Sequence, residues 1–126
     1  MAKIDYSQIT NRQKLIIDEV IDNFDFEKVY EHMVNTNWVW VKEADEDYEN
    51  YQYAVPSINR LKRRLRSMLV EAYTSINTRP ELKETPYMLS CGGFTIFLWQ
   101  PNDECRIFFS VTEMDIDEEY INELEK

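Results

Sequence analysis

The spacing of apolar residues changes along this chain, and the change determines the fold class. Over residues 57–76 the apolar side chains recur every three or four positions, which is the spacing of one helix face. Over 94–99 and 105–111 they alternate, which is typical of strands with one face in a core. The residues that form these patterns are Ile58, Leu61, Leu65, Met68, Leu69, Ala72 and Ile76, then Phe94, Ile96, Leu98, Ile107, Phe109 and Val111. Both kinds of element must bury their apolar faces, so we expect an α+β fold.

Local signals place the remaining elements. Thr10 and Gln13 have the spacing of a capping box, and Asp25 precedes a second helical pattern. In "NWVWV" the tryptophans alternate with valines, as in a strand. We predict helices over 10–22, 26–36 and 57–76, a strand over 37–41, an acidic loop over 42–55, a hairpin of strands 87–99 and 105–112, and a short helix over 116–125. With 126 residues and 44% hydrophobic composition, residues 1–126 form a single small domain. The helices are expected on one face of a small antiparallel sheet of about three strands.

The two glycines of the chain, Gly92 and Gly93, stand side by side where the hairpin begins. Glycine within a strand marks a bulge or a close approach by another group. We expect a kink that shapes the hairpin, with a backbone approach to a bound ligand or partner as the alternative. The hairpin should pair positions whose numbers sum to about 203, which places Cys105 opposite residue 98. Cys91 is then too distant for a disulfide with Cys105.

The charge of the chain excludes several classes of partner. There are 24 carboxylates and 14 cations, for a formal net charge of −10. This charge favours solubility and opposes binding to double-stranded nucleic acid or an anionic membrane. No stretch approaches the roughly 18 apolar residues of a membrane span, and the first residues lack a signal-peptide core. We therefore expect a cytoplasmic protein.

The residue types available for chemistry argue against an enzyme. His32 is the only histidine, and joining it to both cysteines in a metal site would require distant elements to converge. Ser90 lacks the two flanking glycines and the strand-to-helix context of a nucleophile elbow. The acidic run fails the EF-hand pattern, because Asn50 and Pro56 stand where glycine and glutamate are required. We expect no catalytic residue, no metal and no cofactor.

The acidic loop is the first candidate binding surface. Its carboxylates are interleaved with tyrosines, and such a surface could occupy a basic groove on a partner protein. The candidate residues are Asp45, Glu46, Asp47, Tyr48, Glu49 and Tyr51. A second concentration of carboxylates comprises Glu113, Asp115, Asp117, Glu118 and Glu119. For the loop, weak binding of a divalent cation and a purely solvated role are the alternatives.

The helix over 57–76 has the opposite charge. Five cations and no carboxylate lie between residues 56 and 70, and like charges recur at i, i+4 on both flanks. Carboxylates of the acidic loop, the C-terminal tail or a symmetry mate could neutralise them through exposed ion pairs. Alternatively this face binds an anionic nucleotide, with arginines on phosphate and a tryptophan stacked on the base. The candidate ligand-binding residues are Arg60, Arg63, Arg64, Arg66, Trp38 and Trp40.

Three pieces of the chain resemble small uncharacterised accessory proteins of tailed phages and prophages. They are "HMVNTNWVW", "VPSINRLKRRL" and "GGFTIF", in this order within residues 26–112. The acidic loop and the long N-terminal helix depart from the shorter members of that group. The resemblance implies an accessory protein that binds host machinery in the host bacterial cytoplasm.

These observations lead to one functional expectation and one alternative. We expect a non-enzymatic protein that binds a host protein through its acidic and aromatic surface and inhibits a bacterial defence system. The alternative is a protein that binds an anionic nucleotide through the basic helix. Open sheet edges and exposed aromatic residues also favour a homodimer.

Overall fold

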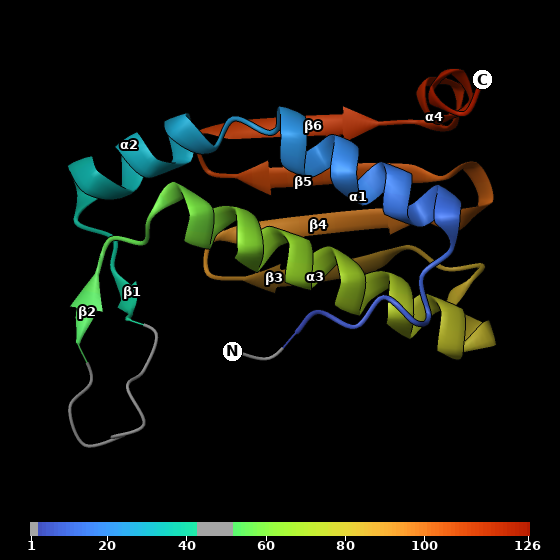
Figure 1. Cartoon of the computed structure of the whole chain (residues 1–126), viewed down its shortest axis with the longest axis horizontal. Helices are drawn as coiled ribbons and strands as arrows, with labels where there is room; N and C mark the ends of the chain where they lie inside the picture. The colour runs from blue at the N-terminus through green and yellow to red at the C-terminus, as the bar shows by residue number, and fades with distance from the viewer. Residues whose placement is uncertain (1–2, 43–51) are drawn as a thin grey trace.

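The computed structural model describes residues 3–42 and 52–126, which form four α-helices and two antiparallel sheets (Figure 1). The helices are α1 (Asn11–Asn23), α2 (Phe26–Thr36), α3 (Ile58–Thr78) and α4 (Glu118–Leu124). The main sheet is a meander of β3 (Tyr87–Cys91), β4 (Phe94–Trp99), β5 (Glu104–Phe109) and β6 (Thr112–Ile116). A smaller sheet pairs β1 (Trp40–Val41) with β2 (Tyr53–Ala54). Short 3-10 helices cover Pro80–Leu82 and Gln100–Asn102.

The α+β class is confirmed, but the main sheet has four strands rather than about three. The segment 87–99 is two strands, because Gly92 and Gly93 reverse the chain between β3 and β4. The predicted strand 105–112 is replaced by β5 and the start of β6. Ile116 ends β6, and the last helix begins only at Glu118 because Asp117 caps it.

Two other predicted boundaries are also corrected. Only Trp40 and Val41 of the segment 37–41 are paired as a strand, since Asn37 takes the left-handed conformation that ends α2. Their partner strand β2 lies within the range 42–55, which we expected to be a loop throughout.

Capping side chains begin the helices where the sequence predicts. Thr10 accepts a hydrogen bond from the backbone N–H of Gln13, and the Gln13 side chain accepts one from Thr10, which completes the capping box. Asp25 caps α2, and Ser57 caps α3.

The core lies between the main sheet and the helices α1, α2 and α3. In Figure 1, α1 and α3 cover one face of the sheet, and α2 lies at the left, beyond the ends of the strands. The α3 stripe is buried, as is the alternating set on β4 and β5. Leu98 pairs with Cys105, as the predicted sum of 203 requires. Cys91 pairs with Phe94 instead, and both cysteines are free thiols.

The glycine pair forms the turn of a hairpin and also contacts aromatic rings. Gly92 has φ +61° and Gly93 has φ +100°, and positive φ at both central positions is the requirement of a type I′ turn. A Cβ on Gly92 would lie 2.7 Å from the Trp40 ring. On Gly93 it would lie 2.6 Å from Phe109 and 2.8 Å from Trp38. The expected shape role is therefore a turn rather than a kink within a strand, and the group that approaches is the protein's own aromatic cluster.

Replacing Gly93 by alanine should destabilise the fold by about 2 kcal/mol, because a side chain there meets both a strained φ and two aromatic rings. Urea denaturation measures the change. Met88→Ala on the neighbouring strand is the control, since Met88 is 64% exposed and its loss should cost less than about 0.5 kcal/mol. Equal stability of the two variants would contradict this account of the turn.

Cys105 and Tyr73 are buried against each other in the core. Burial raises the pKa of the Cys105 thiol to about 12, from an ordinary value of 9.0. Burial, followed by the neighbouring Cys105, also raises the pKa of the Tyr73 hydroxyl. Both groups are therefore held in their protonated forms by the folded state.

The free energy of unfolding should fall as pH rises from about 9 towards 12, because the unfolded chain releases the Cys105 proton and the folded chain keeps it. The slope for this one group is about 1 kcal/mol per pH unit, and below pH 9 the contribution is fully present. Denaturation of Cys105→Ala across this range should show a shallower fall. Cys91→Ala, which removes the exposed thiol, should keep the original slope.

Candidate functional site

Two arginines of α3 converge on the ring of Trp40. The guanidinium carbons of Arg60 and Arg64 lie 5.6 and 5.5 Å from the ring centroid, within the range of cation–π attraction. Arg60 also donates a hydrogen bond to the carbonyl oxygen of Val41, and the Arg64 Nη1 lies 3.7 Å from the Cys91 Sγ. These contacts fasten β1 to α3 and to the hairpin of β3 and β4.

Both tryptophans of the predicted nucleotide platform pack within the molecule. Trp40 lies against Gly92, and its buried indole N–H has no hydrogen-bond partner within residues 3–42 and 52–126. The Trp38 ring lies 5.1 Å from Phe109 and 6.3 Å from His32, measured between centroids. The two rings therefore hold β1 and the residues just before it against the main sheet.

The remaining cations of α3 are directed elsewhere. Arg66 forms an ion pair of 2.8 Å with Asp18 of α1 and donates to the Tyr6 hydroxyl at 3.1 Å. The Lys62 Nζ lies 5.8 Å from the centroid of the Phe26 ring, and Arg63 also has an interaction partner. For Arg66 the ion-pair partner among the described residues is thus on α1, because α1 packs beside α3.

The structure assembles only part of the candidate nucleotide site. Arg60, Arg64 and Trp40 lie together, whereas Arg66 and Trp38 have partners in other places. The six residues of the acidic loop, Asp45, Glu46, Asp47, Tyr48, Glu49 and Tyr51, lie outside the described residues. Lys42 and Gln52, the described residues on either side of this range, are hydrogen-bonded: the Lys42 N–H donates to the Gln52 carbonyl oxygen at 2.6 Å.

Carboxylates of three elements, α1, β6 and α4, lie near the edge of the main sheet that β6 forms (Figure 1). Asp117 caps α4, which follows directly after β6, and the Tyr120 hydroxyl lies 3.3 Å from the Glu19 carboxylate of α1. We call this side the acidic surface; it comprises Glu19, Glu113, Asp115, Asp117, Glu118, Glu119 and Glu123. Five of these residues were noted in the sequence, but the contribution of α1 depends on how the helices pack.

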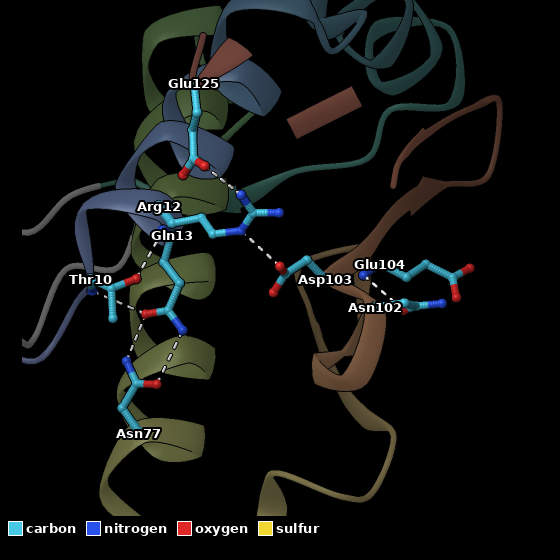
Figure 2. Close-up of polar contacts among 8 residues, drawn as sticks. All are labelled: Thr10, Arg12, Gln13, Asn77, Asn102, Asp103, Glu104 and Glu125. Atoms are coloured by element: carbon cyan, nitrogen blue, oxygen red, sulfur yellow. Dashed lines mark hydrogen bonds and ion pairs between the residues drawn. The ribbon is translucent and has the colours of Figure 1, made fainter. Parts of the chain in front are cut away.

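A polar network fastens α4 to the body (Figure 2). Arg12 of α1 pairs with Asp103 and with Glu125, in both cases at 2.7 Å. The hydrogen bond that Arg12 donates to the Asp103 carboxylate is the main reason that the pKa of Arg12 is raised. Beside it, the buried Gln13 and Asn77 exchange amide hydrogen bonds of 3.1 and 2.7 Å. These groups line an open hollow, but they satisfy one another, so the network is structural.

Sequence reasoning did not foresee the contact between Ser110 and His32. The Ser110 Oγ lies 3.2 Å from the His32 Nε2, although the two residues are 78 positions apart. A hydroxyl beside an imidazole is one part of a nucleophilic site, which also needs a group that orients the imidazole. Among the described contacts His32 has no carboxylate partner, and its ring packs against Trp38 and Phe109. The geometry indicates a packing role for this histidine.

Comparisons with protein-family models, with curated proteins and with solved structures found no match. Within residues 3–42 and 52–126, no three His, Cys, Asp or Glu side chains are placed to hold one metal ion. The helices of the described part of the chain are all too short or too polar to cross a bilayer.

Replacing Arg12 by alanine should loosen α4, because both ion pairs that connect Arg12 to Asp103 and Glu125 are lost. Partly exposed pairs contribute about 1 kcal/mol in total, so the fold should survive. Hydrogen exchange should accelerate at the Ile121 amide, which donates to Asp117 within α4. Arg79→Ala, at an exposed arginine, is the matched control; acceleration in both variants or in neither would contradict the role of Arg12.

Proposed function

We propose that this protein is a non-enzymatic, cytoplasmic binding protein of the phage accessory type. It binds a host protein that has a basic surface, and through this contact it inhibits a bacterial defence system. The acidic surface is the observation that carries the proposal. Residues 104–126 contain eight carboxylates and two cations, and one of these cations, Arg106, is already paired with Asp115 and Glu104.

The distribution of charge supports a protein partner rather than a nucleic acid. Carboxylates crowded on one side attract a basic protein over roughly a Debye length of about 8 Å at physiological salt, and they repel phosphate. Three cations of α3 are engaged within the molecule, because Arg66 is paired with Asp18, and Arg60 and Arg64 lie against the Trp40 ring. The acidic loop would extend the same chemistry if it also faces the partner.

Binding of an anionic nucleotide is the second candidate. It is favoured by one observation, the convergence of Arg60 and Arg64 on the Trp40 ring, which places two guanidinium groups beside an aromatic platform. A phosphate-bearing ligand would have to displace the Arg64 contact with Cys91 and stack on a ring that already packs against Gly92. Nucleotide released from the purified protein by heat, and detected by its ultraviolet absorbance, would support this candidate.

Neutralising α4 should weaken capture of the host partner. The test variant carries Glu118→Gln, Glu119→Gln and Glu123→Gln, and it should raise the Kd about tenfold, because the partner loses its attraction to the acidic surface. The tagged protein is used to isolate the partner from bacterial lysate, and the Kd is then measured with both purified proteins at several salt concentrations.

The matched control makes the same change in charge elsewhere, with Glu71→Gln, Glu81→Gln and Glu84→Gln. It should bind as tightly as the original chain. Retention of no protein, or equal affinity of the two triple variants, would show that the acidic surface does not bind a host protein.

A further inference from the structure

Within residues 3–42 and 52–126, one face of the main sheet has no helix over it. The helices α1 and α3 lie over the other, inner face (Figure 1). The burial of β4 and β5 alternates, so every second residue of these strands lies on the side away from the helices. We call this opposite side the outer face. Its large apolar side chains are Met88, Phe97, Trp99 and Phe108, and its carboxylates on the edge strand β6 are Glu113 and Asp115.

The strand register brings the apolar residues together. Met88 of β3 pairs with Phe97 of β4, and Trp99 follows two positions later on the same face. Phe108 of β5 pairs with Thr95, which places it diagonally across from Phe97. Met88 is 64% exposed and the three rings are half-buried, whereas Phe94 and Ile96 on the inner face are completely buried. A contiguous apolar patch of this kind marks an interaction site.

The charge of the outer face determines which partner fits it. Glu113 and Asp115 form an acidic border, and the cation between that border and the apolar patch is Arg106. Arg106 pairs with Asp115 at 2.9 Å and lies 5.3 Å from the Phe108 ring centroid, so its charge is already offset. A second copy of this acidic chain would bring like charges together, whereas a basic partner would meet opposite charge.

The dimensions of the face fit one helix. Two strand spacings separate the apolar residues of β4 from the carboxylates of β6, or about 10 Å. This matches the diameter of about 10–12 Å of an α-helix with its side chains. A helix lying along the strands would place an apolar stripe on Phe97 and Trp99 and its lysines or arginines beside Glu113 and Asp115.

From these observations we propose that the outer face binds a basic amphipathic helix of the partner protein. The inference rests on the proposed function, and it deepens that proposal by naming the surface and the form of the partner segment. The acidic surface is continuous with it, because Glu113 and Asp115 of β6 belong to both.

The first test uses a synthetic amphipathic helical peptide of leucine and lysine as the probe, with NMR of the labelled full chain. The peptide should shift the signals of the Met88 methyl group and of Phe97 and Trp99. Met88→Ser should raise the peptide Kd about tenfold. Val34→Ser, which removes a side chain 49% exposed on α2, should leave the Kd unchanged. Glu113→Lys should weaken binding more than Glu71→Lys, an equal charge change on α3.

Three outcomes would overturn the inference. Shifts confined to the helical layer would place the peptide elsewhere. A dimer in solution that Met88→Ser dissociates would assign the outer face to a second copy. If an isolated host partner binds Met88→Ser and Val34→Ser equally tightly, the partner does not use the outer face. The proposed function would then hold, but this inference would not. Conversely, suppose that the tagged protein captures no host protein while the peptide still shifts the signals of the outer face. That result would reject the proposed function and leave the helix-binding surface intact.

Discussion

The contact between the glycine turn and the aromatic cluster is the interaction on which the architecture depends. Gly92 and Gly93 reverse the chain at positive φ and, lacking side chains, allow Trp38, Trp40 and Phe109 to approach the backbone. One turn thereby joins β3 and β4, the end of β5, and the segment that follows α2. The arginines of α3 then close over Trp40 from the helical layer. This contact and the hydrogen bond from Arg60 to the Val41 carbonyl oxygen together hold β1 against the body.

The sequence predicts the periodic elements well because periodicity is a local property. The stripe of α3, the capping residues and the pairing of Leu98 with Cys105 all follow from spacing within one or two elements. The turn was missed because Gly92 and Gly93 were interpreted as a kink within one strand, although the less exposed positions are odd-numbered before the pair and even-numbered after it. The strand β6 was missed because Glu113 and Asp115 were interpreted as part of the acidic tail.

The candidate sites were harder to predict, because charge partners depend on how helices pack. Arg66 meets Asp18, and Ser110 meets His32, across distances in sequence that no spacing rule covers. The apolar outer face could, however, be predicted from the sequence. In β4 both sets of alternate residues are mainly apolar, with Phe97 and Trp99 on the face opposite to Phe94, Ile96 and Leu98. A strand with two apolar faces needs two partners, and the helices of residues 3–42 and 52–126 cover only one of these faces (Figure 1).

The meander of the main sheet has a consequence for how the chain folds. Each strand pairs with the next one along the chain, so the sheet can form through short loop closures that cost little entropy. The ion pairs of α1 are different, because Arg12 is separated from Asp103 by 91 positions and from Glu125 by 113. These contacts of α1 therefore cost more loop-closure entropy than the strand pairs of the meander, and we expect them to form after the sheet.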